Sequence, residues 1–247
     1  MPESGEGLFD LVSLSATPVQ ADTALPPLLR RSWYFSDIAD FLAASDAVIL
    51  SKLQLDSRFP ILPTQTDAWV AEISLLRSAL AGAEGRIYLE FTIPRMGRRV
   101  DVVLLVRGIV FALEFKIGAH EFLAEDVDQA YDYAMDLKYF HEASHDLPVV
   151  PVLVATNAKP RPPNLVPHSR VAGLYETVCA TKDDLRDVLQ HLQQALPGKG
   201  VSPEEWETSR YCPTPTIIEA ARALYAGHGV ADISRSDAGA INLEHTS

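Results

Sequence analysis

Two acidic side chains and one lysine stand in an otherwise apolar stretch of this 247-residue chain. Asp101 precedes Glu114 by thirteen residues, and Lys116 follows Glu114 by two. Carboxylates that face each other repel unless a cation lies between them. Two acids and a lysine that converge on one point of a buried sheet indicate a site for a divalent metal ion. The sequence therefore predicts such a site at Asp101, Glu114 and Lys116.

The same stretch predicts a β-hairpin, with strands over 99–106 and 109–116 and a two-residue turn at Arg107-Gly108. If the residues that flank the turn face each other, paired positions sum to 215, and Asp101 lies opposite Glu114. The period of two along a strand places the lysine on the same face as Glu114. A three-residue loop would instead move Asp101 to the other face. A surface hairpin with solvated charges is the remaining alternative.

Both faces of this hairpin are apolar. One face is expected to carry the acids together with Val103, Leu105, Val110 and Ala112. The other is expected to carry Val102, Leu104, Ile109, Phe111, Leu113 and Phe115. A sheet that is apolar on both faces is covered on both sides. Charged side chains in such a sheet are usually functional or paired.

The elements around the hairpin follow from periodicity, caps and turn residues. We expect helices over 36–44, 67–82, 121–143 and 183–196, and further strands over 86–93, 147–155 and 171–178. Pro94–Gly97 is expected to be a turn, and 59–63 and 159–167 are Pro-rich connections. Three consecutive strands followed by a crossover helix and another strand predict an α/β fold of order αβββαβ, a mixed central sheet flanked by helices.

This order, with Asp on the second strand and Glu-x-Lys on the third, resembles the PD-(D/E)XK nuclease superfamily. The resemblance implies a restriction-endonuclease-like core in which Asp101 and Glu114 bind Mg²⁺ or Mn²⁺, and Lys116 positions or activates the attacking water. Glu72 resembles the additional acid often found on the first core helix of the family. The backbone carbonyl of Phe115, between the two motif residues, is a further candidate metal ligand. The name-giving Pro-Asp is absent, since valine precedes Asp101.

Gln129 and Tyr133 form Q-x-x-x-Y on the following helix, which resembles the RecB-like branch of these nucleases. Residues four apart lie on one helical face, so both side chains are expected to reach the same end of the sheet. The alternative is that Tyr133 packs in the core and Gln129 is a solvated neighbour.

From about residue 33 to the C-terminus, the strings PRMGRRVDVVLL, QAYDYAMDLKYFH and PTPTIIEAARALY resemble the region before the motor of Schlafen group-3-like DNA/RNA helicases. The chain contains no G-x-x-x-x-G-K-[ST], so the ATPase activity of that family is not carried over. Either the chain is a truncated or split member, or its nuclease-like domain works without a motor. We expect a flexible lead over 1–30, a nuclease-like domain over 31–197 and a linker or helical tail over 198–247 that leads to the absent helicase.

Composition bounds the partners and the compartment. The formal net charge of −12 is an objection to nucleic-acid binding, because phosphate contacts need Lys and Arg. Distribution matters more than the total, and four arginines near the hairpin are candidates for nucleic-acid binding: Arg95, Arg98, Arg99 and Arg107. Without a signal peptide, an apolar run near eighteen residues or a cysteine framework, the chain is expected to be cytoplasmic with no membrane partner.

One competing motif is His141-Glu142-Ala143-Ser144-His145, which fits the H-E-x-x-H signature of zinc proteases. It falls at the end of the expected helix, where His141 is more simply read as packing or capping. The leading expectation is a metal-dependent nuclease, with DNA favoured over RNA and a helicase as a further partner. The alternative from another class is a catalytically silent module of the same fold that binds nucleic acid or a helicase. A zinc protease is the remote alternative.

Overall fold

The computed structural model describes residues 31–57, 62–93, 98–168, 171–215 and 217–218. Arg95, the turn Pro94–Gly97 and the lead 1–30 lie outside the described residues, as does the tail beyond 218. No helix within the described ranges is long and apolar enough to span a membrane.

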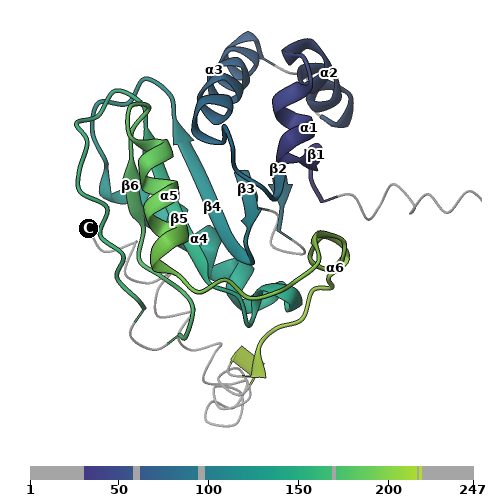
Figure 1. Ribbon diagram of the computed structural model, residues 1–247, viewed down its shortest axis with the longest axis vertical. Helices are drawn as coiled ribbons and strands as arrows, with labels where there is room; N and C mark the ends of the chain where they lie inside the picture. The colour runs from purple at the N-terminus through teal and green to yellow at the C-terminus, as the bar shows by residue number, and fades with distance from the viewer. Residues whose placement is uncertain (1–30, 58–61, 94–97, 169–170, 216, 219–247) are drawn as a thin grey trace, which may run out of the picture.

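A six-stranded mixed sheet forms the centre of the fold, with strands in chain order across it (Figure 1). Its strands are β1 (Tyr34–Asp37), β2 (Arg86–Thr92), β3 (Arg99–Val106), β4 (Ile109–Lys116), β5 (Val149–Ala155) and β6 (Val178–Ala180). The helices are α1 (Ile38–Ala43), α2 (Asp46–Asp56), α3 (Pro63–Ala79), α4 (Ala124–Phe140), α5 (Leu185–Ala195) and α6 (Pro203–Thr208), with a 3₁₀ turn η2 (Glu142–Ser144). The predicted α/β fold class is confirmed, and α3-β2-β3-β4-α4-β5 is the predicted order.

The register of the central hairpin agrees with the prediction. Strands β1 to β4 are antiparallel, and observed β3–β4 pairs run from Val106–Ile109 to Val102–Leu113, a sum of 215 throughout. Arg107 and Gly108 have φ of 52° and 72°, which fits the two-residue turn that matches strand twist. A Cβ on Gly108 would lie 1.7 Å from the carbonyl oxygen of Lys199, so this position requires glycine. Strand β5 pairs with β4 in parallel, with α4 as the crossover between them, and β6 pairs with β5 in parallel. Helix α5 follows β6 in the chain.

Helices cover both faces of the sheet, as its two apolar faces require. In Figure 1, α5 lies in front of the sheet and α4 behind it. One core contains α1, α2, α3 and α5 with residues such as Val102 and Phe111, and the other contains α4 and α6 with residues such as Val103 and Val110. The apolar residues of β3 and β4 away from the acids therefore lie on the two faces of the sheet that the alternation predicts.

Several local expectations were wrong. Ser36 lies in β1 and the helix begins at Ile38, while α2 was not expected. The strand expected over 171–178 is reduced to β6 and isolated bridges at Leu174 and Tyr175. Packed structure also continues beyond residue 197, because the Trp206 side chain on α6 is fully buried in the core that faces α4.

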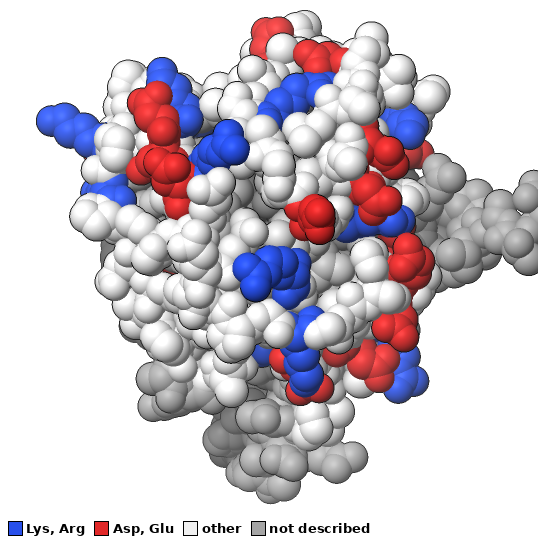
Figure 2. Space-filling view, viewed as in Figure 1, with Lys and Arg blue, Asp and Glu red and all other residues white. Residues whose placement is uncertain are grey.

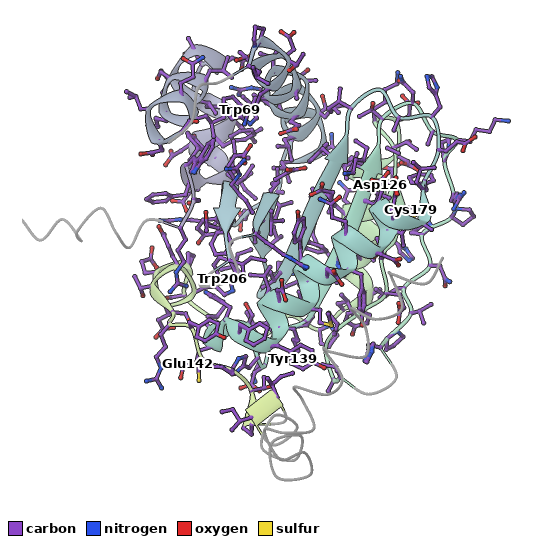
Figure 3. All side chains as sticks on the ribbon, turned by 180° about the vertical axis from the view of Figure 1, so that it is seen from behind. Trp69, Asp126, Tyr139, Glu142, Cys179 and Trp206 are labelled. Carbon is purple, nitrogen blue, oxygen red and sulfur yellow. The ribbon has the colours of Figure 1, made fainter. Side chains whose placement is uncertain are left out.

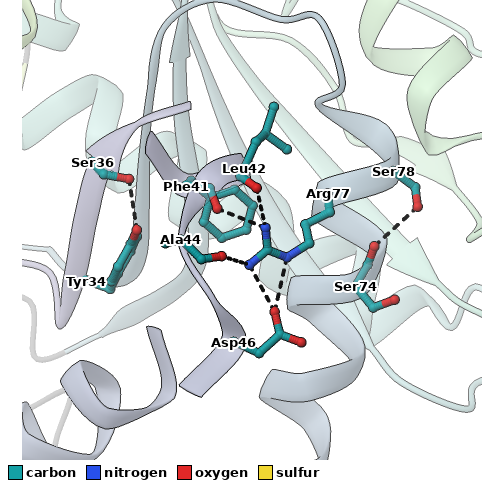
Figure 4. A network of polar contacts seen from close by, with 9 residues as sticks. All are labelled: Tyr34, Ser36, Phe41, Leu42, Ala44, Asp46, Ser74, Arg77 and Ser78. Atoms are coloured by element: carbon teal, nitrogen blue, oxygen red, sulfur yellow. Dashed lines mark hydrogen bonds and ion pairs between the residues drawn. The ribbon is translucent and has the colours of Figure 1, made fainter. Parts of the chain in front are cut away.

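Helix α3 is held in place by Arg77 (Figure 4). Its guanidinium donates to the carbonyl oxygens of Phe41, Leu42 and Ala44, at 3.1, 2.7 and 2.5 Å, and to the Asp46 carboxylate at 2.9 Å. These carbonyls end α1, where backbone acceptors lack partners inside the helix. Arg77 therefore holds α3 against α1 and α2. Because α3 is held, the side chains that it directs toward the sheet are held as well.

Candidate functional site

Asp101 interrupts the hydrogen-bond ladders on both of its sides. The observed β3–β4 pairs stop at Val102–Leu113, and the β2–β3 pairs omit Asp101 while they include its two neighbours. Instead, the Phe115 N–H donates to Asp101 Oδ2 at 2.9 Å. A side-chain carboxylate thus takes the place of a backbone acceptor between the ends of β3 and β4.

The residue opposite Asp101 on β2 is Glu90, and in both strands the alternation of side chains between the two faces of the sheet is interrupted here. Pairs of β2 and β3 sum to 191, and Glu90 has a φ of 54°. Leu89 belongs to the core that faces α3, but Tyr88 and Phe91, three apart, both belong to the core that faces α4. A regular strand would place two residues three apart on opposite faces, so the alternation slips at Glu90. The expected strict alternation is wrong at this one level of the sheet.

Helix α4 supplies the second wall of the site. Gln129 Nε2 donates to Glu114 Oε1 and to the Tyr133 hydroxyl, both at 2.9 Å, and Gln129 Oε1 accepts from Lys116 Nζ at 2.9 Å. Lys116 Nζ also lies 3.2 Å from Glu114 Oε1 and 3.1 Å from Asp126 Oδ1. Gln129 therefore contacts two residues at the end of β4, and Tyr133 bonds to Gln129 and lines the same cavity. Asp126 was not anticipated, although it lies one turn before Gln129 on the same helix.

Helix α3 supplies the opposite wall. Trp69 Nε1 donates to Glu90 Oε1 at 2.6 Å, and Arg99 Nε forms an ion pair with Glu90 Oε2. Glu72 lies one turn after Trp69 and reaches the same group of acids. In Figure 3, Trp69 on α3 and Asp126 on α4 lie in the upper half of the molecule, and Glu142 and Tyr139 lie in the lower half.

A cavity of about 600 Å³ opens between these walls. It is lined by Gln65, Ala68, Trp69, Glu72, Glu90, Arg98, Arg99, Asp101, Glu114, Phe115, Gln129 and Tyr133. All predicted catalytic residues except Lys116 line it, and Lys116 contacts two that do. Arg107 lies at the far end of β3, roughly 25 Å from Arg99 by the rise of a strand. The structure therefore does not bring Arg107 to the cavity.

The four acids in this cavity lack a matching number of cations. Burial, with the charges of Glu114 and Glu72, raises the pKa of Asp101 well above its usual range. Burial, with the charges of Glu90 and Glu114, raises the pKa of Glu72 to about 8. Burial also raises the pKa of Glu114, although Lys116 opposes the shift. Burial lowers the pKa of Lys116, but hydrogen bonds and charges from Asp126 and Glu114 outweigh it, and the net shift is upward.

The donor set fits a hard divalent cation in part. Glu114 Oε2 is buried with no hydrogen-bond partner, and Asp101 and Glu72 are acids whose charge is uncompensated. Because the N–H and C=O of one strand residue point to the same side, the Phe115 carbonyl is directed toward β3. The described residues contain no group of three or more His, Cys, Asp or Glu side chains arranged to hold a metal. Mg²⁺ needs only one or two carboxylates, with water and substrate oxygens as the other ligands.

The H-E-x-x-H residues are arranged differently from a zinc-binding helix. Helix α4 ends at Phe140, and Glu142–Ser144 is a 3₁₀ turn. The His141 ring is fully buried, its Nδ1 lies 2.8 Å from Ser144 Oγ, and its ring packs on Trp206 at 4.5 Å. Burial lowers the pKa of His141 to about 3. The imidazole therefore belongs to the core, and Glu142 pairs with Arg210 at the surface.

Cations outside the cavity are scattered. Figure 2 shows Lys and Arg side chains interspersed with Asp and Glu on the face of the molecule that carries α5, without a continuous positive tract in its described part. Arg98 lies 3.2 Å from Asp132 and 3.5 Å from Asp136 on α4. Among the described residues, Arg98 and Arg99 are the two arginines that line the cavity.

Comparisons with known proteins add little to this geometry. No family model matches the chain, and no curated protein matches it significantly. Among solved structures, the chain is similar to the crystal structure of protein VC1899 from Vibrio cholerae, with 13% sequence identity and a TM-score of 0.30. The match covers 67% of this chain and 47% of that chain, so this chain spans about half the length of the solved protein. A similarity at this level carries no argument about function.

Proposed function

We propose that this protein is a metal-dependent nuclease that hydrolyses phosphodiester bonds of nucleic acid, with DNA favoured. The observation that carries the proposal is the arrangement around Glu114. One of its oxygens is held by Lys116 and Gln129, the other is buried without a partner, and Asp101 lies beside it at the interrupted end of the ladder. The resemblance to PD-(D/E)XK nucleases of the RecB-like type rests on the same residues and is part of the proposal.

Asp101, Glu114 and the Phe115 carbonyl would hold Mg²⁺ or Mn²⁺. The bound ion would polarise the scissile phosphate and lower the pKa of a coordinated water. Lys116, which pairs with Glu114 and Asp126, would orient the attacking water and offset charge that develops on the phosphate oxygens. Gln129 binds both Glu114 and Lys116, so it fixes the separation of the acid and the cation.

Substrate phosphates would enter past Arg98 and Arg99, the arginines at the cavity. A chain with a net charge of −12 repels a polyanion at long range, and this cost is reduced if a partner delivers the substrate. The resemblance to the region before the motor of Schlafen group-3-like helicases makes a helicase or other ATPase the partner that we propose.

The test combines metal binding with cleavage. Labelled single- and double-stranded DNA and RNA are incubated with Mg²⁺, Mn²⁺ or EDTA, and Mn²⁺ binding is measured by calorimetric titration. Wild type is compared with Asp101→Asn and with Asp128→Asn, which removes an exposed acid of α4. We expect Asp101→Asn to lose cleavage and weaken Mn²⁺ binding, and Asp128→Asn to retain both. Equal Mn²⁺ binding and cleavage in all three proteins would show that the site is assigned wrongly.

A further inference from the structure

A cation–aromatic stack lies at the side of the cavity, formed by residues distant in the sequence. The guanidinium carbon of Arg99, at the start of β3, lies 4.1 Å from the ring centroid of Trp33, just before β1. The Trp33 ring meets Trp69 of α3 edge to face, at 6.0 Å and 81°. We call Trp33 and Arg99 the Trp33–Arg99 stack.

Glu90 fixes the orientation of this stack. Its carboxylate accepts from Trp69 Nε1 and pairs with Arg99 Nε, so one buried acid holds both the cation and Trp69, the ring that meets Trp33. The Arg99 side chain is 37% exposed and lines the cavity, whereas the Glu90 side chain is 8% exposed. A planar cation held in this way loses little further conformational freedom when a ligand binds.

We propose that the Trp33–Arg99 stack binds a nucleobase, and that the site takes single-stranded nucleic acid. The Arg99 guanidinium lies against the Trp33 ring and also lines the cavity, and a base would stack on it from the cavity. Guanidinium planes and aromatic rings are the surfaces on which proteins stack unpaired bases. Bases inside a duplex are already stacked on both sides, so the interaction is open only to an unpaired strand or a frayed end.

The size of the cavity agrees with this substrate class. About 600 Å³ lies within the range of small-ligand pockets, and suits a short stretch of one strand. The stack recognises the face of a base, which DNA and RNA share. The inference rests on the proposed nuclease function, but its own readout is binding, and cleavage serves only to tell failure of one proposal from failure of the other.

The test measures binding by fluorescence anisotropy in EDTA and again in Ca²⁺. The probes are labelled oligothymidylate, oligouridylate, a duplex of equal length, and an abasic sugar-phosphate oligomer of equal length. The variants are Arg99→Lys, which keeps the charge but removes the plane, and Trp33→Leu, which removes the support. Arg161→Lys is the matched control, because the Arg161 guanidinium lies over the ring of Phe122, at 4.8 Å from its centroid, and neither residue lines the cavity.

We expect wild type to bind the thymidylate strand about tenfold more tightly than the abasic oligomer. Arg99→Lys and Trp33→Leu should each lose most of this ratio, and Arg161→Lys should keep it. An unchanged ratio in Arg99→Lys, or a wild type that does not distinguish the two oligomers, would overturn the inference. Cleavage with no base preference would leave the nuclease proposal intact and refute the stack. A preference for the base without any cleavage would support the stack and refute the nuclease proposal.

Discussion

Replacement of Glu72 by glutamine tests whether the acids of the cavity are electrostatically unbalanced. Glu72 has a pKa raised to about 8 from its ordinary value of 4.5, by burial and by the charges of Glu90 and Glu114. A carboxyl with a higher pKa in the folded protein than in the unfolded chain binds its proton more tightly when folded. Its contribution to stability is therefore fully present below about pH 4.5 and is lost as the pH rises toward about 8.

The magnitude follows from the size of that change. At 1.36 kcal/mol per pH unit, a rise from 4.5 to about 8 corresponds to at most about 5 kcal/mol. Because the neighbouring acids titrate together and Glu72 is partly exposed, removal of one charge relieves only part of this cost. We expect Glu72→Gln to raise the free energy of unfolding by about 1–2 kcal/mol near pH 9, with almost no change near pH 4.5.

The assay is urea unfolding in EDTA across this pH range. Glu84→Gln, at an exposed acid in the loop after α3, controls for the loss of one negative charge from an acidic protein. The stabilisation should grow with pH in Glu72→Gln and stay small in Glu84→Gln. Equal curves for the two variants, or a Glu72→Gln protein that is less stable near pH 9, would refute the reasoning. Mg²⁺ should stabilise wild type more than Glu72→Gln at high pH, because the ion supplies the missing charge.

Three further outcomes follow from the contacts. Gln129→Leu removes hydrogen bonds to Glu114 and Lys116, so the cleavage rate should fall about 10- to 100-fold while the circular dichroism spectrum stays that of wild type. An unchanged rate would exclude a positioning role for Gln129. Arg77→Ala should lower the free energy of unfolding by about 1–3 kcal/mol in urea, with Ser78→Ala near zero as the control, and equal values would contradict the anchoring of α3. Burial lowers the pKa of His141 to about 3, so the stability that its neutral ring contributes should be lost as the pH falls below about 6.5. Thermal melts of His141→Phe should therefore show a weaker loss of melting temperature at acid pH than those of wild type. The same dependence of melting temperature on pH in both proteins would argue against burial of the neutral ring.

The hairpin could be predicted because a two-residue turn leaves one register. Once Arg107 and Gly108 are the turn, the β3–β4 pairs from Val106–Ile109 to Val102–Leu113 follow. The expected pair of Asp101 and Glu114 is not formed, because the ladder ends one residue before it. Helix period then brings Gln129 and Tyr133 to that end of the sheet, as observed. These inferences needed only local geometry.

Glu90 was missed although a signal for it exists. A β2–β3 register that sums to 191 places Glu90 opposite Asp101, but the turn Pro94–Gly97 did not specify that register by its length alone. The slip of both strands at this level depends on a positive φ at Glu90, which no pattern of apolar residues reveals. The available hint in the sequence was an acid, Glu90, between two apolar neighbours in an apolar strand.

Contacts between distant segments account for the remaining differences. The stack of Trp33 on Arg99 and the burial of Trp206 join elements that no periodicity links. Strand β1 has four residues, too few for a reliable alternation, so the sequence favours Ser36 as a helix cap. Near Gly173, whose φ is 76°, the chain turns instead of forming the expected strand.

The most direct test of the central claim is the rate of Mg²⁺-dependent cleavage of a single-stranded oligonucleotide by wild type, Lys116→Ala and Lys199→Ala. Lys199 lies against the Arg107–Gly108 turn at the other end of the hairpin, so its removal controls for the loss of one lysine. Lys116→Ala should be slower by about 100-fold or more, Lys199→Ala should match wild type, and EDTA should stop all three. Cleavage by Lys116→Ala at the wild-type rate, or cleavage that persists in EDTA, would contradict the account.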